Sequence, residues 1–235
     1  MSRFGKSLYY IYLRTEQHDS IVARYLHVKS TMNQVLLQQR IYNVSRDLQT
    51  ELIRKSIHLS IALVPFVANA VGTASTLGLL AAGTVFYAYA ETRRNAGVTI
   101  PIITRITELS SRKRDLNRFV LGPITLGIGA MLALLLYPNP AATIAIYALA
   151  FGDGFASLFG KIFGKLRIPA TGGKTIEGSL ACATAVTIST YAVVPVPHIV
   201  IPTAIGATLL EVLPTGDADN LILPVGVGLV ASILI

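Results

Sequence analysis

Charged residues are scarce in this sequence. Asp, Glu, Lys and Arg make up 14% of its 235 residues, whereas hydrophobic residues make up 52% and the mean hydropathy is +0.59. An average soluble protein carries about 25% charged residues, so this composition argues against a soluble protein with buried helices. It favours an integral membrane protein instead.

Three further features are missing. Cys182 is the single cysteine and lies in an apolar stretch, so neither a disulfide nor a thiolate-bound metal is indicated. The first 50 residues contain no secretory signal, because Glu16, His18 and Asp19 interrupt the apolar run after the basic start. The basic segments also lack interleaved aromatic residues that could stack on bases, which argues against nucleic acid as a partner despite the net charge of +8.

The basic residues are confined to three zones. Nine of the 20 Lys and Arg residues lie between Arg3 and Lys55, seven between Arg93 and Arg118, and four between Lys161 and Lys174. The remaining stretches, 56–92, 119–160 and 175–235, contain no basic residue and are 37, 42 and 61 residues long. Since a helical span needs about 20 apolar residues, these stretches predict two, two and three spans.

Glycine and proline break each apolar stretch where a turn is needed. The predicted fold is therefore all-α: a polytopic membrane helical bundle of about seven transmembrane helices. Its spans are expected at 57–72, 76–91, 120–137, 141–160, 178–195, 198–213 and 221–235. Counting the crossings puts all three basic zones on one face, which the positive-inside rule assigns to the cytoplasm. The N-terminus is then cytoplasmic and the C-terminus lies on the opposite side.

Residues 1–50 are predicted to form an N-terminal region ahead of a transmembrane catalytic domain at 51–235. Apolar residues recur in it at helical spacing, with Arg and Lys available for a polar side. The recurring positions are Ile21, Tyr25, Val28, Met32 and Val35 or Leu36. This amphipathic helix fits either the cytoplasmic membrane surface, with anionic lipids as partners, or the surface of a partner helix.

An ionisable residue inside a predicted span is the strongest indication of a functional site. Asp153 lies about two turns before the basic end of the span at 141–160, where a charge is costly. On a helix it shares a narrow polar face with Ser157, Gly160 and Gly164. The lysines at the rim of this face are Lys161 and Lys165. Packing of small residues between helices is the alternative explanation for the glycines, but it does not explain Asp153.

A glycine-containing loop follows at 171–179. Gly172 and Gly173 can expose backbone N–H groups to a phosphate, and Lys174 would add a positive charge. A Walker A motif is rejected, because Ile168 stands where that motif needs glycine and no parallel-sheet unit is present. The alternative is a solvated basic loop in which Thr175 caps the next helix.

Acidic residues gather ahead of the last predicted span. Glu211, Asp217, Asp219 and Asn220 fall on the expected cytoplasmic face, with no Lys or Arg nearby in the sequence. Mg²⁺ prefers oxygen ligands and is bound by one or two carboxylates together with nucleotide phosphates. These residues therefore predict a metal site. A Gly-Asp turn with an Asn or Asp cap is the alternative.

Charged groups also border the first two spans. Arg54, Lys55 and His58 open the first span, within one helical turn of each other. Arg54 and Lys55 also fit the snorkelling of long basic side chains to the interface, and His58 also fits burial as a neutral, hydrogen-bonded histidine. Glu91 and Arg94, at the end of the second span, have the spacing of an i,i+3 ion pair.

Taken together and in this order, the motifs resemble the CTP-dependent lipid kinase family, which contains dolichol kinase, phytol kinase and CTP-dependent diacylglycerol kinase. The resemblance covers about 51–224. The residues that carry it are Arg54-Lys55-x2-His58, Gly122-Pro123, Gly152-Asp153, Gly160-Lys161-x2-Gly164, Lys174-Thr175-x-Glu177-Gly178-Ser179, Glu211 and Asp219-Asn220-x3-Pro224. Ala218 is a departure, because the relatives usually have two adjacent acids before the asparagine. Asp217, one residue earlier, is the alternative acid.

The resemblance implies Mg²⁺-dependent transfer of the γ-phosphate of CTP to the hydroxyl of a membrane lipid alcohol, of the polyprenol, dolichol, phytol or diacylglycerol type. It implies Asp153 as the catalytic base with His58 as the substitute, and Asp153, Asp219 and Asp217 as metal ligands. The residues implied for nucleotide binding are Arg54, Lys55, Gly160, Lys161, Gly164, Lys165, Gly172, Gly173, Lys174, Thr175, Glu177 and Asn220.

The site is expected on the cytoplasmic face of the membrane. That membrane would be the cytoplasmic membrane in a prokaryote, or the endoplasmic reticulum or plastid membrane in a eukaryote. Whether the chain forms a homo-oligomer is left open.

Two other functions fit parts of the pattern. The middle segment also resembles the phosphatidate cytidylyltransferases, which use CTP and Mg²⁺ to make CDP-lipids. Their C-terminal Asp-Arg-x-Asp signature is replaced here by 216–220, Gly-Asp-Ala-Asp-Asn, which favours the kinase. A small membrane transporter would place ionisable residues near the middle of several spans and show an internal repeat. Asp153 alone fits the first of these features, and no repeat is visible in the sequence.

Overall fold

The computed structural model describes residues 32, 34, 36–39, 42, 45–111 and 118–235. The chain divides into two units, Met1–Asp47 and Leu48–Ile235. Most of the predicted amphipathic helix at 21–36 lies outside the described residues, so it stays a prediction. The second unit carries all the site residues predicted from the sequence, and the fold described below is that of this unit.

The described part of the chain is helical and contains no β-strand, apart from an isolated bridge between Arg167 and Thr175. The second unit begins with helical residues 48–60, which continue into η1. The elements that follow are η1 (Ile61–Leu63), α2 (Val64–Val71), α3 (Thr73–Asn95), α4 (Pro101–Ser110), α5 (Gly122–Leu136), α6 (Ala141–Tyr147), η3 (Ala148–Asp153), α7 (Gly154–Phe163), α8 (Ile176–Val193), α9 (Pro197–Val212), η4 (Gly216–Ala218) and α10 (Asp219–Leu234). The all-α prediction is therefore confirmed for these residues.

Proline and glycine set several helix boundaries, as their chemistry requires. Proline occupies the first turn of α2, α4, α5 and α9, where its missing N–H leaves no hydrogen bond unmade. Gly72 separates α2 from α3 with a φ of 87°, a value that favours glycine. Each of the seven ranges predicted as a span coincides with helical structure.

Within the described residues, three helices are long and apolar enough to cross a membrane. They are Ala141–Phe163, Ile176–Val193 and Gly216–Leu234. The apolar helices α5 and α9 are shorter. The composition and these three helices together indicate an integral membrane protein. The number of spans and the side of the membrane on which each end lies stay predictions.

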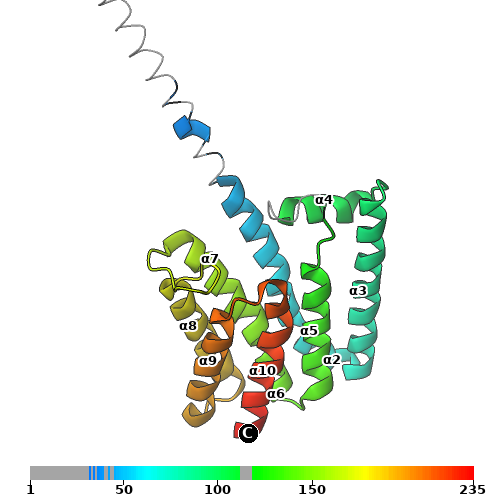
Figure 1. The fold of residues 1–235 in the computed structure, drawn as a ribbon. Helices are drawn as coiled ribbons and strands as arrows, with labels where there is room; N and C mark the ends of the chain where they lie inside the picture. Colours follow the sequence, from blue (N-terminus) through cyan, green and yellow to red (C-terminus); the bar gives the residue numbers. More distant parts are fainter. Residues whose placement is uncertain (1–31, 33, 35, 40–41, 43–44, 112–117) are drawn as a thin grey trace, which may run out of the picture. The chain divides into compact units, whose positions relative to one another are not determined.

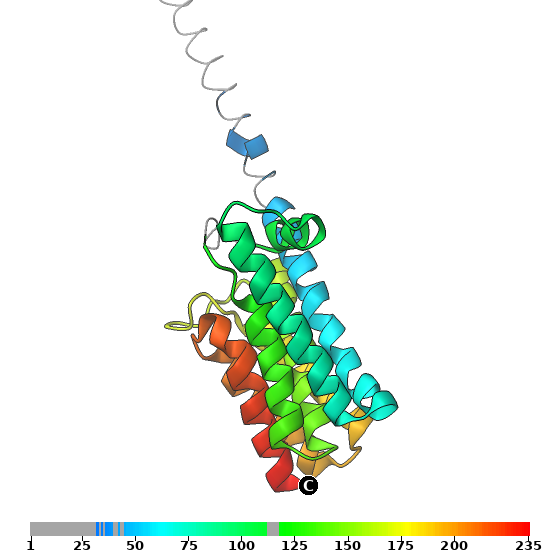
Figure 2. The same cartoon turned by 90° about the vertical axis from the view of Figure 1, so that its right-hand side faces the viewer.

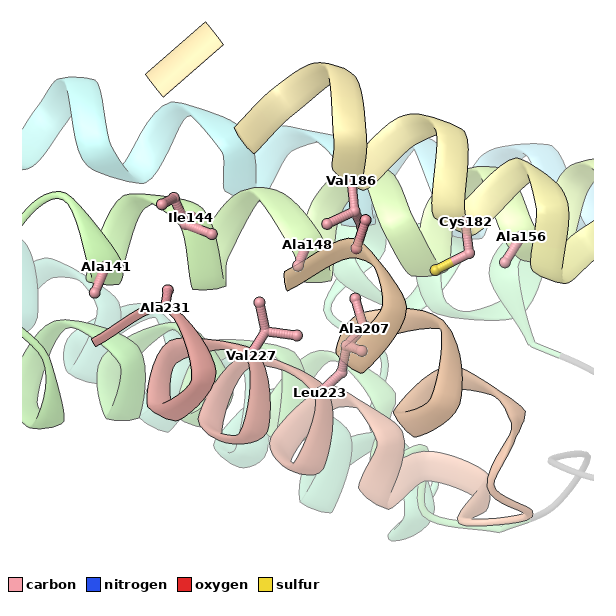
Figure 3. Packing of buried hydrophobic residues seen from close by; sticks show 11 residues of the cluster. Ala141, Ile144, Ala148, Ala156, Cys182, Val186, Ala207, Leu223, Val227 and Ala231 are labelled. Atoms are coloured by element: carbon pink, nitrogen blue, oxygen red, sulfur yellow. The ribbon is translucent and has the colours of Figure 1, made fainter. Parts of the chain in front are cut away.

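The continuous helix Ala141–Phe163, formed by α6, η3 and α7, is the centre of the packing. One core cluster surrounds Ile144, Ala148, Val186 and Leu223, and it joins this helix to α8, α9 and α10 (Figure 3). A second cluster joins the same helix to η1, α2 and α5 through residues such as Ala145 and Leu149. Because both clusters use opposite sides of one helix, its residues 141–150 are nearly all buried.

Helix α4 was not predicted from the sequence and has an inverted pattern of exposure. Its buried residues are the polar Thr104, Thr107 and Ser110, whereas its exposed residues include Ile102, Ile106 and Leu109. Figures 1 and 2 show α4 running across the ends of α3 and α5. The hydroxyl of Thr107 donates to that of Tyr87 in α3 over 3.4 Å. An apolar stripe on the outer side of a helix lying across the bundle is typical of a membrane-interface helix.

Candidate functional site

A cavity of about 680 Å³ opens at the end of the helices where the loop after α7 and the turn between α9 and α10 lie (Figure 1). Its volume is in the range of about 300–1,000 Å³ that is usual for ligand sites. The predicted site residues that line it are Arg54, Asp153, Gly160, Lys161, Gly164, Gly172, Gly173, Lys174, Thr175 and Asp219. Residues more than 160 positions apart in the sequence therefore meet at one site.

Asp153 lines this cavity and is the last residue of the π-helical turn η3. π-Turns are rare and often occur at functional sites. The Asp153 Oδ2 atom pairs with Lys55 Nζ and lies 3.1 Å from His58 Nδ1. All three side chains are buried, so the Asp153 charge is balanced by a cation one helix away rather than by water.

A second, smaller cavity of about 40 Å³ is also lined by Asp153. Arg54, Asp153 and Asp219 line both cavities. The smaller cavity is completed by Lys55, Ile57, His58, Ser110, Val120, Gly122, Pro123, Leu126, Asp217 and Asn220. Asp153 and Asp219 therefore line two cavities of very different size.

Glu51 organises the charged rim of the larger cavity. Its Oε1 atom accepts hydrogen bonds from Arg54 Nη2 and from Ser157 Oγ, and Lys161 Nζ lies 3.8 Å from Oε2. Glu51 is buried, whereas about 21% of the Arg54 side chain and 37% of the Lys161 side chain is exposed. The carboxylate thus holds Arg54 and Lys161 at the edge of the cavity.

The loop between α7 and α8 is held in shape by a short hairpin. The N–H of Ile168 donates to the carbonyl of Lys174, and the N–H of Ile176 donates to the carbonyl of Leu166, each over 2.9 Å. At its tip, Gly172 and Gly173 have φ values of 72° and 99° and are exposed. Such a conformation is readily adopted by glycine but is unfavourable for other residues.

Glu177 anchors this loop. Its Oε1 atom accepts a hydrogen bond from the backbone N–H of Lys165 over 2.9 Å and one from that of Leu166 over 3.2 Å. The side chains of Glu177 and Lys165 both lie outside the lining of the larger cavity. The structure therefore gives Glu177 a role in positioning the loop.

Three glycines let α7 and α8 approach closely. A Cβ atom at Gly164 would lie 2.7 Å from Thr175 Cγ2, and one at Gly178 would lie 2.7 Å from the carbonyl oxygen of Ala156. A Cβ at Gly160 would lie 3.0 Å from Thr175 Oγ1. The packing explanation for these glycines is thus supported, although Gly160 and Gly164 also line the cavity.

Lys174 and Thr175 directly precede α8 and line the larger cavity. Thr175 Oγ1 accepts a hydrogen bond from the N–H of Gly178, so the predicted helix cap is confirmed. Lys174 Nζ lies 3.2 Å from Glu211 Oε1, and the Ser179 hydroxyl is 3.5 Å from Glu211 Oε2. Glu211 is a buried carboxylate that faces the cavity beside the glycine loop.

Asn220 joins the starts of α10 and α5. Its side-chain amide donates to Thr125 Oγ1 over 2.8 Å and to the carbonyl of Gly122 over 3.3 Å. Its backbone N–H donates to Asp219 Oδ1 over 2.9 Å. Asn220 and Asp217 both line the smaller cavity, and neither lines the larger one.

A third charged group fixes the chain just ahead of α5. Arg94 binds both oxygens of Glu91 through Nε and Nη2, at 2.8 and 2.6 Å. Glu91 Oε1 accepts from the N–H of Val120 over 2.8 Å, and Arg94 Nη2 donates to the carbonyl of Arg118 over 2.9 Å. The predicted ion pair is therefore present, and it holds the residues that lead into the wall of the smaller cavity.

Some site residues were not singled out by their sequence pattern. Glu51 could have been found from its spacing, because an acid three residues before Arg54 and four before Lys55 lies on the same face of a helix as these two cations. No sequence pattern pointed to Ser110, because α4 was not predicted. Ser110 lines the same cavity as Asp153, which is distant from it in the sequence.

The carboxylate oxygens of this site suit a hard cation whose coordination is completed by a bound ligand. Among the described residues, no cluster of three or more His, Cys, Asp or Glu side chains could hold a metal ion alone. Mg²⁺ needs one or two carboxylates and takes its other ligands from water and phosphate. Asp219 and Asp153 line the same cavity as the cations Arg54 and Lys174, so these residues fit a magnesium-bound phosphate ligand.

Comparison with known protein families, with characterised proteins and with solved structures finds no match to this chain. The function must therefore be inferred from the site itself.

Proposed function

We propose that this protein is a kinase of membrane lipid alcohols that uses CTP and Mg²⁺. The observation that supports this most directly is the pair of cavities that share Arg54, Asp153 and Asp219. A phosphotransferase must bring a nucleotide and an acceptor together at one reactive centre. The choice of CTP and of a lipid alcohol rests on the family resemblance of the motifs.

The larger cavity is the proposed nucleotide site. Phosphoryl transfer asks for positioning and neutralisation of charge rather than covalent work by the protein. Lys161, Lys174 and Arg54 would bind phosphate oxygens, and the N–H groups at Gly172 and Gly173 would add to this cradle. Asp219 would hold Mg²⁺, which neutralises the phosphate charge when bound.

Asp153 is the proposed general base. The hydroxyl oxygen of the lipid attacks the γ-phosphorus, the bond from that phosphorus to the β–γ bridging oxygen breaks, and CDP leaves. The hydroxyl proton passes to the Asp153 carboxylate, whose Oδ2 atom pairs with Lys55 Nζ and lies 3.1 Å from His58 Nδ1. Lys55 is fully buried and lies outside the lining of the larger cavity, so its role is to orient Asp153 rather than to bind nucleotide.

The membrane topology is part of the proposal. Seven spans with a cytoplasmic N-terminus would put the loop at 164–175, the turn at 213–218 and the start of α5 on the cytoplasmic face. CTP could then enter from the cytoplasm while the alcohol reaches the site from the lipid.

The proposal is tested with purified protein in lipid nanodiscs, γ-labelled CTP or ATP, Mg²⁺ and a panel of lipid alcohols. Label from CTP should enter the lipid fraction, with CDP as the second product. Pyrophosphate and a CDP-lipid would instead identify a cytidylyltransferase. Label from ATP alone, or from neither nucleotide with any lipid, would refute the proposal.

The variant Asp153→Asn tests the role of the base within the same assay. It keeps the size of the side chain but cannot accept the proton, so turnover should fall by at least about 100-fold. Membrane insertion and CTP binding should persist. Residual activity above a tenth of the wild-type rate would contradict the assigned role.

A further inference from the structure

The smaller cavity combines two kinds of lining. Eight of its 13 lining residues are polar or charged, namely Arg54, Lys55, His58, Ser110, Asp153, Asp217, Asp219 and Asn220, whereas four have apolar side chains. The apolar residues are Ile57, Val120, Pro123 and Leu126. A lipid hydroxyl with its first carbons needs this combination, because the oxygen requires a hydrogen-bonding partner and the carbons do not.

The size of this cavity limits what can enter it. Its volume is about 40 Å³, and a single water molecule needs about 10–15 Å³ on this measure. The space therefore accepts about three heavy atoms, such as a hydroxyl and one or two carbons. It is too small for a glycerol carbon that carries an ester beside the reacting hydroxymethyl group.

An apolar surface lies next to this cavity. Phe119 and Leu121, on either side of the lining residue Val120, are exposed. Helix α4 ends at Ser110, which lines the cavity, and it exposes its apolar stripe of Ile102, Ile106 and Leu109. A hydrocarbon chain attached to a hydroxyl in the cavity would thus find apolar surface outside it.

We propose that the smaller cavity is the acceptor site and that it selects the hydroxyl end of a single-chain primary alcohol, such as a phytol or polyprenol, over diacylglycerol. This inference rests on the proposed kinase function for its reaction, but binding of the alcohol can be measured without turnover. Asp153 would then contact the acceptor hydroxyl in the small cavity, while the phosphates occupy the large one.

Two substitutions fill the cavity from different elements. A Cβ atom at Gly122 would meet no atom within 4 Å, so Gly122→Ala adds volume without a clash. The Ser110 hydroxyl donates to carbonyls of its own helix, so Ser110→Leu removes no contact with another element. The matched controls are Gly83→Ala, which is also free of contacts within 4 Å, and Ser232→Leu, whose hydroxyl also bonds back to its own helix.

The binding experiment uses a phytol analogue with a photoreactive diazirine on the hydrocarbon chain just beyond its first two carbons, which would lie at the mouth of the cavity. The protein in nanodiscs is irradiated without nucleotide, digested and analysed by mass spectrometry. We expect labelling of peptides that contain Ile57 or residues 120–126, and a loss of at least fivefold in Ser110→Leu. Labelling confined to other segments, or labelling unchanged in both cavity variants, would overturn the acceptor site.

The activity experiment compares phytol, a short polyprenol and diacylglycerol. Gly122→Ala and Ser110→Leu should raise the KM for phytol at least tenfold and leave the KM for CTP unchanged, whereas both controls should behave as wild type. Diacylglycerol phosphorylated as efficiently as phytol would overturn the proposed selectivity. Specific photolabelling without any phosphate transfer would refute the kinase function and support the alcohol site, so the two failures are distinguishable.

Discussion

Two lysine–carboxylate pairs flank the site, and they differ in their access to water. Lys55 and Asp153 are buried, with 2% and 9% of their side chains exposed. Lys174, which pairs with Glu211, keeps 22% of its side chain exposed and stands on the wall of the large cavity. Separating the two charges of a buried pair costs much free energy. A lysine at a cavity wall can instead move from a carboxylate to the phosphate of a ligand. The first pair is suited to fixing geometry and the second to binding ligand.

The largest effect is expected when the buried pair is broken. Lys55→Met leaves the Asp153 charge buried without its cation, which should reduce the free energy of unfolding by about 3–5 kcal/mol. Thermal and denaturant unfolding in detergent micelles measures this loss. Activity should vanish as well, because Asp153 is no longer oriented.

A double variant separates these two consequences. Lys55→Met/Asp153→Leu removes both charges and should recover most of the lost stability, yet it should remain inactive. A double variant as unstable as Lys55→Met would show that the pair does not account for the loss.

A smaller and different effect is expected at the cavity wall. Lys174→Met removes a charged contact to phosphate and should weaken CTP binding about tenfold, measured by titration calorimetry. The unfolding midpoint should fall less than in Lys55→Met, because Lys174 keeps 22% of its side chain exposed whereas Lys55 keeps 2%. Lys165→Met is the control, because this lysine lies outside the cavity lining. Equal weakening in both variants would show that net charge, rather than the position of Lys174, controls affinity.

The smallest effect is expected at the loop anchor. Glu177→Ala removes the acceptor for two backbone N–H groups, so the glycine loop should lose its fixed shape and the KM for CTP should rise about threefold. Faster cleavage of 166–174 by limited proteolysis should accompany this rise. Glu177→Gln keeps one acceptor oxygen and should fall between Glu177→Ala and wild type. An unchanged proteolysis rate in Glu177→Ala would mean that the hairpin alone shapes the loop.

The helical fold could be predicted because apolar length and helix-breaking residues are local signals. Gly72, Pro140 and Pro197 act at the positions where they occur in the sequence, and the described helices end or begin beside them. Helix α4 escaped prediction because its polar face is the buried one and its apolar stripe is exposed. Such a pattern predicts a helix only if its apolar stripe is expected to face the membrane.

The site could be predicted only as a set of residues. Charge and glycine content singled out Asp153, Lys174 and Asp219, all of which line the larger cavity. The division of labour among them depends on long-range contacts, such as the pairing of Lys55 with Asp153, that no local spacing encodes. For the same reason Glu177 was grouped with the nucleotide ligands, although its carboxylate binds the backbone of the loop.

The π-helical turn Ala148–Asp153 changes the direction in which side chains point in the second half of the central helix relative to the first half. An extra residue in a helix rotates everything after it by about 100° relative to an unbroken helix. The first half of the helix can therefore keep its apolar sides against both cores, while the second half presents Asp153, Ser157 and Gly160 to the cavity. Deleting one residue from this turn would align the two halves and turn the carboxylate away from its cation. The turn thus lets one helix meet two packing demands that a uniform helix could not meet together.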